Sequence, residues 1–186
     1  MKVEGLEFTY LIQPANKYTF TMPDLKRWVE EHCVGKVLNL FAGKIKLNVD
    51  EVRNDIDPEM PADYHMDAEI FCKMAIEKRW KFDTVILDPP YSLRKSMEKY
   101  GGRYMSSYQK IKELIPEILN DGGTVITLGY NTFGLERTAG FKKVAICIVN
   151  HCSLANDTLV LVERKVKDSP KAAQRKRADT LKRWFE

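Results

Sequence analysis

The chain has 186 residues, of which 44% are hydrophobic and 30% are charged, and its formal net charge is +4 at pH 7. A chain of this length and composition is expected to fold as a single soluble domain with a full hydrophobic core. No apolar run approaches the ~18 residues of a membrane span, and the N-terminus lacks the pattern of a signal peptide, so we expect a cytoplasmic protein with no membrane partner.

The first half of the chain alternates helical and strand patterns. A helix is expected over residues 24–31, since Pro23 suits the first turn of a helix and Gly35 is a natural stop. Three strands of decreasing clarity follow, at residues 37–41, 51–56 and 62–66. The second of these is less apolar than the first, which favours a position near the edge of a sheet.

The second half continues the alternation around one strongly apolar strand. A helix at 69–80 precedes residues 82–87, whose apolar side chains on both faces are typical of a central strand in a parallel sheet. The remaining expected elements are a helix at 108–119, a strand at 124–128, a short helix or loop at 133–139, and two strands at 144–149 and 158–162. This order predicts an α/β fold with a mostly parallel sheet and an antiparallel edge strand.

A four-residue motif directly follows the expected central strand and consists of Asp88, Pro89, Pro90 and Tyr91. The string should occur by chance in a chain of this length only about once in a thousand cases. Ligands of parallel sheets bind beyond the carboxyl ends of the strands, so the position favours a functional site. A rigid loop opened by a Pro-Pro pair, with a packing tyrosine, is the alternative interpretation.

The motif suits the chemistry of an exocyclic amino group on a nucleobase. Such a group is a poor nucleophile because its lone pair is delocalised into the ring, and two acceptors on its N–H bonds would draw the nitrogen toward tetrahedral geometry. Asp88 can supply a carboxylate, and Pro89 a carbonyl that Pro90 holds in an extended orientation. Tyr91 offers a flat face on which an extruded base can stack.

At these four residues the chain resembles the class I S-adenosyl-L-methionine-dependent amino-methyltransferases of the Asp-Pro-Pro-Tyr type, a group of DNA and RNA enzymes that includes adenine methylases. The resemblance spans residues 17–163 by the order of elements, although only the motif is specific. It implies a Rossmann-like class I methyltransferase sheet and S-adenosyl-L-methionine as cofactor. A single methyltransferase domain is expected at 1–164, followed by a basic tail at 165–186.

The resemblance places cofactor contacts in the loop after the first strand. The implied residues are Asn39, Phe41, Ala42 and Gly43. The family usually has an acidic residue at the position of Asn39 and a second glycine where Lys44 and Ile45 stand, so the loop departs from the family pattern. The stretch from Gly43 to Glu51 is also too short for the helix that normally follows, and we expect that helix to be reduced to a turn.

Two further loops complete the implied cofactor site. Asp55 would accept hydrogen bonds from the ribose hydroxyls and Ile56 would cover the adenine, with Asp57 as an alternative ribose ligand. Asp67 would receive the adenine amino group, with the N–H of Ala68 nearby. Asp67 could equally cap the following helix, and both roles can coexist because a carboxylate has several acceptor positions.

Basic residues gather in two segments that could contact phosphates. Residues 165–186 contain eight Lys or Arg against three Asp or Glu, a net charge of +5, which leaves −1 for residues 1–164. The loop at 92–108 is glycine-bearing and carries four more basic residues. Each segment is either a solvated surface or a nucleic-acid contact, and the sequence leaves both interpretations open.

A metal site is not expected. Cys147, His151 and Cys152 are close in sequence, but no fourth ligand stands at a usual spacing. The implied reaction also needs no metal, because the leaving group of the cofactor carries the chemistry.

Together these features predict an enzyme that methylates an exocyclic amino group of a nucleobase in DNA or RNA, with N6 of adenine favoured. One alternative is a non-catalytic nucleic-acid-binding module that keeps the methyltransferase fold. A second is a protein amide methyltransferase, although such enzymes favour Asn where Asp88 stands. No segment is large enough for a separate target-recognition domain, so a protein partner is a possible source of target specificity.

Overall fold

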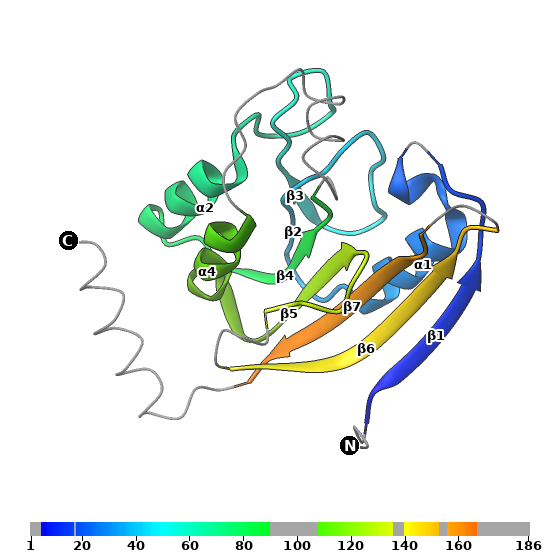
Figure 1. Cartoon of the computed structure of the whole chain (residues 1–186). Coiled ribbons are helices and arrows are strands. Elements are labelled where there is room, and N and C mark those ends of the chain that lie inside the picture. Colours follow the sequence, from blue (N-terminus) through cyan, green and yellow to red (C-terminus); the bar gives the residue numbers. More distant parts are fainter. Residues whose placement is uncertain (1–4, 17, 90–107, 136–139, 153–155, 167–186) are drawn as a thin grey trace.

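The computed structural model describes residues 5–16, 18–89, 108–135, 140–152 and 156–166, and shows one sheet with helices on both faces (Figure 1). The strands are β1 (Glu7–Ile12), β2 (Val37–Asn39), β3 (Glu51–Arg53), β4 (Phe82–Leu87), β5 (Leu119–Gly129), β6 (Phe141–Asn150) and β7 (Thr158–Lys165). The helices are the short 3-10 helix η1 (Thr19–Thr21), α1 (Pro23–His32), α2 (Ala68–Glu77) and α4 (Tyr108–Ile118). Within these ranges no helix is both long and apolar enough to cross a membrane.

The seven strands lie in the order β1-β6-β7-β5-β4-β2-β3. Strand β7 pairs antiparallel with both β5 and β6, whereas the other pairs in the sheet are parallel. The predicted α/β fold with a mostly parallel sheet is therefore confirmed. The antiparallel strand β7 lies inside the sheet, between β5 and β6. Strand β1, which the sequence analysis did not expect, forms the edge by pairing with β6.

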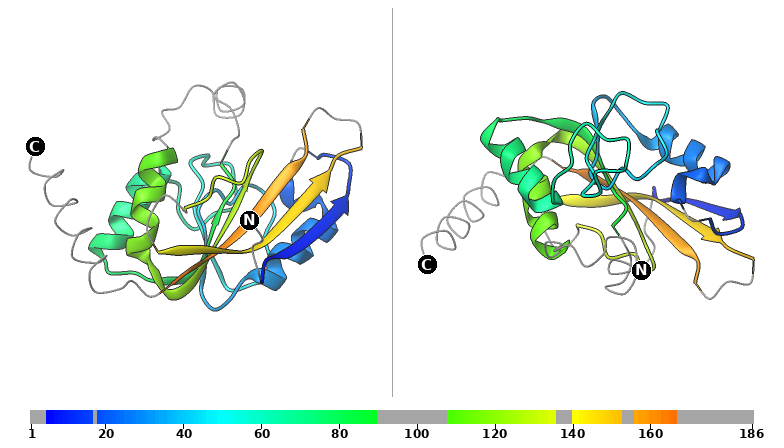
Figure 2. Two further views of the ribbon diagram at one scale, coloured as in Figure 1. Left: turned by 60° about the horizontal axis from the view of Figure 1, so that its bottom comes forward. Right: turned by 90° about the horizontal axis from the view of Figure 1, so that it is seen from above.

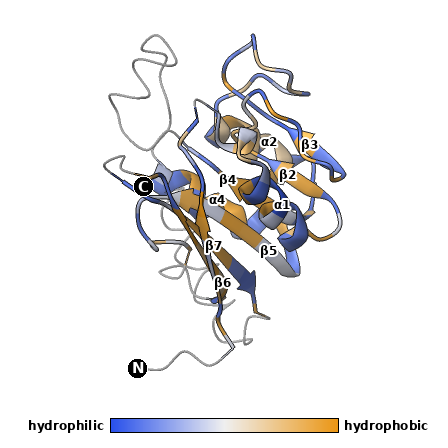
Figure 3. Ribbon diagram, turned by 90° about the vertical axis from the view of Figure 1, so that its right-hand side faces the viewer, coloured by the Kyte–Doolittle hydropathy of each residue, from blue (hydrophilic) through white to orange (hydrophobic). Residues whose placement is uncertain are grey.

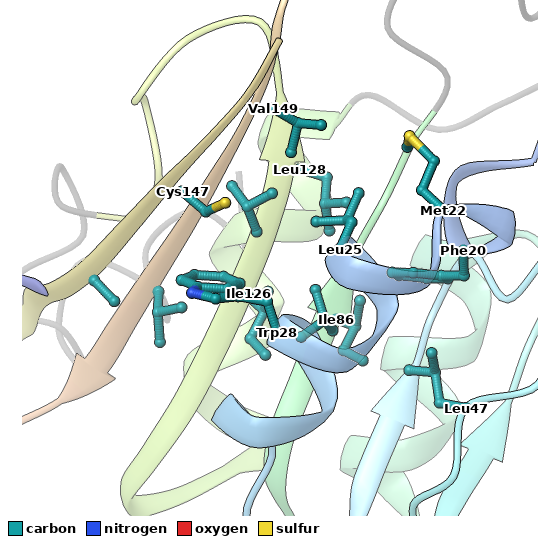
Figure 4. Close-up of a cluster of buried hydrophobic side chains, with 14 of the residues drawn as sticks. Phe20, Met22, Leu25, Trp28, Leu47, Ile86, Ile126, Leu128, Cys147 and Val149 are labelled. Atoms are coloured by element: carbon teal, nitrogen blue, oxygen red, sulfur yellow. The ribbon is translucent and has the colours of Figure 1, made fainter. Parts of the chain in front are cut away.

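The two faces of the sheet bury separate hydrophobic cores. Helix α1 covers one face, where Leu25, Trp28 and Val29 pack against β4 to β7 (Figure 4). Helices α2 and α4 cover the other face over β2, β4 and β5 (Figures 1 and 2). Strand β4 alternates between them, with Ile86 in the first core and Val85 in the second, so it is apolar on both faces as a central strand must be (Figure 3).

The weakest predicted strands are shorter in the structure. The predicted strand at 51–56 is reduced to β3, and that at 62–66 to an isolated bridge between Asn54 and Tyr64. The side chain of Asn54 bonds to backbone groups of neighbouring segments and so ends the regular ladder. The stretch between β2 and β3 contains no helix, which agrees with the expectation that this connection is too short for one.

Phe71→Ala should lower the free energy of unfolding by about 3–5 kcal/mol, the usual cost of removing a buried phenylalanine. The Phe71 side chain is fully buried in the core beneath α2, and its ring meets that of Tyr64 edge-on at a centroid distance of 5.3 Å. Urea unfolding measures the loss. Ile70→Ala is the matched control because Ile70 is 55% exposed, and it should cost less than about 1 kcal/mol. Equal losses would contradict the packing of α2.

Candidate active site

The loops after β2, β3 and β4 meet at one edge of the sheet, because these three strands are parallel neighbours. The side chain of Asn54, which is 1% exposed, lies in the loop after β3. It links that loop to the loop after β2 and to the segment before α2. Its Nδ2 donates to the carbonyl of Leu40 at 3.2 Å and to that of Met66 at 3.0 Å. Its Oδ1 accepts the N–H of Met66 at 3.2 Å. One buried amide thus fixes the relative positions of three chain segments.

Gly43 closes the loop after β2 in a left-handed conformation, with φ of +57°. Its N–H donates to Oδ2 of Asp55 at 2.8 Å, and the N–H of the preceding Ala42 donates to the carbonyl of Asn54 at 2.9 Å. A Cβ at Gly43 would meet no atom within 4 Å, so the backbone conformation and not crowding favours glycine. The loop also leaves open space over this residue.

A buried ion pair supports the same loop from below. Arg53 donates from Nη2 to the carbonyls of Gly43 at 2.9 Å and Ala42 at 3.4 Å, and its Nη1 lies 3.4 Å from Oε1 of Glu51. Both side chains of this pair are nearly or fully buried. Glu51 in turn accepts the N–H of Leu47 at 3.0 Å. The irregular connection between β2 and β3 is therefore held by charged groups that point inward from β3.

Asn39, the last residue of β2, joins this network. Its side chain is fully buried, and its Nδ2 donates to Oε2 of Glu51 at 3.1 Å. The Oδ1 atom of Asn39 is buried and has no hydrogen-bond partner among the described residues. Phe41, two residues later, is half-buried against the core under α2. The end of β2 thus carries a buried acceptor that the described residues leave unsatisfied.

The two candidate ribose ligands are held differently. Asp55 is 3% exposed, and its two carboxylate oxygens accept the N–H groups of Gly43 and Asp57, the latter at 2.9 Å. Asp57 is more exposed and accepts the N–H of Glu59 at 3.1 Å. A carboxylate offers about four acceptor positions, so Asp55 keeps capacity for further donors. Ile56 between them is half-buried.

Asp67 is the N-cap of α2. Its Oδ1 accepts the N–H groups of Glu69 at 2.9 Å and Ile70 at 3.4 Å, which confirms the predicted capping. Ala68, the first residue of the helix, is buried. The contact of Asp67 with an adenine ring, which the sequence resemblance implies, remains a prediction.

Asp88 and Pro89 follow β4 and are half-buried, whereas Pro90 and Tyr91 lie outside the described residues. Near Asp88 stands the hydroxyl of Tyr108, at the start of α4. Burial is the main cause and raises the pKa of this hydroxyl, whereas the Thr127 hydroxyl lowers the pKa by a smaller amount. The charges of Asp88 and Glu163 add still smaller increases to the pKa. Tyr108 therefore stays a neutral phenol close to the motif.

The residues considered for a metal site have other roles. The ring of His151 bonds through Nδ1 to the carbonyl of Gln13 at 2.9 Å and through Nε2 to the hydroxyl of Thr158 at 2.8 Å. Cys147 is buried in the core beneath α1, and Cys152 is exposed. In the part of the chain that the structure describes, no three His, Cys, Asp or Glu side chains are grouped to hold a metal ion.

Comparison with known proteins shows a likeness in three dimensions only. No protein-family model and no curated protein matches the chain. The structure of SMU.776, described as a methyltransferase and complexed with SAH, matches with a TM-score of 0.56 at 13% identity over 76% of this chain and 48% of that one. TrmN from Thermus thermophilus matches with a TM-score of 0.53 at 15% identity over 78% and 49%. The fold is that of the S-adenosyl-L-methionine-dependent methyltransferases.

The likeness extends to a further structure described as such a methyltransferase, from Streptococcus mutans, with a TM-score of 0.53 at 14% identity over 76% of this chain and 48% of that one. This chain spans about half the length of these three structures. At such low identity the likeness establishes the Rossmann-like methyltransferase fold alone. The activity, substrate and partners of this chain are therefore inferred from the residues of the site.

Sequence reasoning missed the residues that shape the loops after β2 and β3. Arg53, Asn54 and Glu51 lie in or beside a short strand and match no motif. A signal was nevertheless present, since this run of polar residues occupies a segment that otherwise reads as a strand within the sheet. Charged and amide groups in such a place must find partners, and the nearest irregular backbone is the loop after β2.

Arg53→Met should lower the free energy of unfolding by about 3–5 kcal/mol, because it leaves the buried carboxylate of Glu51 without its cation. Chemical denaturation at neutral pH measures this loss.

The matched control is Arg27→Met, which breaks an exposed ion pair with Asp24 of 3.1 Å. That variant should cost about 1 kcal/mol or less. Similar small losses for both variants would show that Arg53 does not support the loop as described.

Proposed function

We propose that this chain is an S-adenosyl-L-methionine-dependent methyltransferase that acts on an exocyclic amino group of a nucleobase in DNA or RNA, with N6 of adenine favoured. One observation carries the proposal: Asp88 and Pro89 leave the carboxyl end of the central strand β4, beside the loops that follow β2 and β3. In sheets of this kind a ligand binds at that edge. The methyltransferase fold agrees with this position.

The residues at this edge fit the cofactor. S-adenosyl-L-methionine presents an ammonium group, two ribose hydroxyls and an adenine amino group, all of which are donors. The edge supplies acceptors in the buried Oδ1 of Asn39 and in the carboxylates of Asp55 and Asp67. The open space at Gly43 allows the methionine portion close to the backbone. We infer that Ala42 and Phe41 line this portion and that Ile56 and Ala68 flank the adenine.

The cofactor, when bound, supplies a methyl group on a positively charged sulfur as the electrophile. Asp88 and the carbonyl of Pro89 would each accept one N–H of the target amine and so orient its nitrogen toward that methyl group. The nitrogen would take that methyl group as the bond from carbon to sulfur breaks. Asp88 would receive the surplus proton from the nitrogen or pass it to water. Pro90 would hold the carbonyl of Pro89 in an extended orientation, and Tyr91 would stack on the extruded base.

The choice of a nucleobase over other amines depends on the motif. Asp88 provides a carboxylate where an enzyme for protein amides would favour a carboxamide, which supports a ring-linked amine as the target. Lys165 ends β7 and donates to the carbonyls of Pro116 and Leu119 at 2.9 Å. The other basic residues of 165–186 and those of 92–107 lie outside the described residues, and their contact with phosphates is a prediction from charge alone. The same proposal includes a protein partner that supplies specificity for the target sequence.

Asp88→Ala should reduce single-turnover methyl transfer at least ~100-fold, because it removes one of the two groups that orient the amine. Affinity for S-adenosyl-L-methionine should change little. Total DNA and total RNA, incubated with labelled cofactor and analysed as nucleosides, identify the substrate on which the rate is measured.

Asp88→Asn is the matched variant, since it keeps the shape and one acceptor but loses the charge. It should retain more activity than Asp88→Ala. If Asp88→Ala methylates at close to the normal rate, the motif is only a rigid loop. If the unchanged chain binds cofactor but methylates neither nucleic acid, the chain is a binding module.

Asp55→Ala should weaken cofactor binding by about 1–3 kcal/mol, the range for hydrogen bonds to a charged group. Because Asp55 also accepts the N–H of Gly43, the variant should lose conformational stability as well. Calorimetry gives the affinity and thermal unfolding the stability. Asp57→Ala is the control and should leave both nearly unchanged. The reverse order of affinities would assign the ribose to Asp57.

A further inference from the structure

The loops that follow β2, β3 and β4 are strongly acidic. As described at residues 40–50, 54–67 and 88–89, they contain seven Asp or Glu residues. The Lys and Arg residues in these ranges are Lys44 and Lys46 alone. Carboxylates suit the hydroxyls and amino groups of S-adenosyl-L-methionine, but the methionine portion of this cofactor also carries a carboxylate of its own. Like charges repel, so binding that group at an acidic edge requires a cation beside it.

The buried cation under the loop after β2 already has partners. Nη2 of Arg53 donates to the carbonyls of Ala42 and Gly43, and its Nη1 lies 3.4 Å from Oε1 of Glu51. Arg53 is 4% exposed, so its guanidinium is largely closed to a ligand. The charge of Arg53 is thus used within the protein, to neutralise Glu51 and to hold the backbone of the loop.

Lys44 directly follows the turn at Gly43. A Cβ added at Gly43 would meet no atom within 4 Å, and Lys44 itself is exposed. Although the edge is rich in carboxylates, none of those in the described residues forms an ion pair with Lys44. Lys44 therefore places a positive charge beside the open space and keeps that charge available to a ligand.

The residues after Lys44 anchor the loop to the core under α1. Leu47 is 1% exposed and belongs to the hydrophobic cluster that also contains Phe20 (Figure 4). Ile45 and Val49 are partly buried against the same cluster. Alternate side chains of this segment thus point inward, and the exposed Lys44 extends from a backbone that is held in place.

An aromatic ring from a distant part of the sequence holds the end of the Lys44 side chain. Nζ of Lys44 lies 5.9 Å from the centroid of the Tyr18 ring, which is within the range of a cation–π contact. Tyr18 immediately precedes η1, so the segment before α1 borders the loop after β2. Lys46 makes no ring contact in the part of the chain that the structure describes. The Tyr18 contact therefore distinguishes Lys44 from its neighbour and restricts where its ammonium can lie.

We propose that Lys44 binds the carboxylate of the cofactor's methionine portion, with the ring of Tyr18 orienting its ammonium. The amino-acid group of the cofactor is then recognised at both of its charges. The buried Oδ1 of Asn39 is an acceptor for the ammonium, and Lys44 is a donor for the carboxylate. This inference rests on the cofactor of the proposed function, but it does not depend on which base is methylated.

Calorimetry of the full chain with two probes tests the proposal. S-adenosyl-L-homocysteine carries the amino-acid portion, whereas 5′-methylthioadenosine lacks it. Lys44→Met keeps the aliphatic stem and removes the charge, so it should weaken binding of S-adenosyl-L-homocysteine at least ~10-fold, as expected for the loss of a charge-assisted hydrogen bond. Affinity for 5′-methylthioadenosine should stay nearly unchanged. Lys44→Arg keeps the charge and should retain most of the affinity for S-adenosyl-L-homocysteine.

The control is Lys46→Met, which removes the same charge from an exposed position two residues along the same loop. Its affinities for both probes should match those of the unchanged chain. The proposal is overturned if Lys44→Met weakens both probes alike or neither, or if Lys46→Met weakens S-adenosyl-L-homocysteine as much. In these cases the unchanged chain still binds the cofactor product, so the proposed function stands. An unchanged chain that binds neither probe overturns the cofactor assignment, and this proposal with it.

Discussion

Three consecutive buried residues at the end of β3 hold the edge of the sheet on which the candidate site depends. Arg53 donates to carbonyls of the loop after β2, Asn54 bridges that loop to the segment before α2, and Asp55 accepts the N–H of Gly43. Irregular backbone that is removed from water needs such partners, since each unpaired polar group is costly. No helix follows β2 to satisfy the loop, so side chains from the neighbouring strand do so.

Burying these charged groups costs free energy. This indicates that the network mainly fixes the geometry of the backbone and adds little to the stability of the fold. A buried ion pair such as Glu51 with Arg53 contributes little net free energy, because desolvation offsets the attraction. A satisfied buried network does, however, restrict the backbone to one arrangement. Two buried atoms of the network, Oδ1 of Asn39 and Nε of Arg53, make no hydrogen bond within the described residues. One is an acceptor and the other a donor, so the described residues leave the network incompletely satisfied.

Local sequence patterns predicted those parts of the fold that depend on local order. The helices α1, α2 and α4 and the strand β4 were expected because their apolar periodicity and caps lie within a few residues. Strand β1 was missed because its pairing with β6 joins residues that are far apart in the sequence. The role of Arg53 was missed for a similar reason, since its burial follows from the loop that it supports. The contacts expected of Pro90 and Tyr91 remain predictions.

The two edges of the sheet bury their apolar side chains unequally, and β1 is the strand that leaves apolar side chains exposed. A strand with one wet face normally alternates apolar and polar side chains, as the pleat requires. In β1 the inward face carries Thr9 and Leu11, whereas the outward face carries Phe8 and Tyr10. The larger apolar side chains thus point away from the core. Such a sequence suits a strand that is covered on both faces, and α1 covers only one of them.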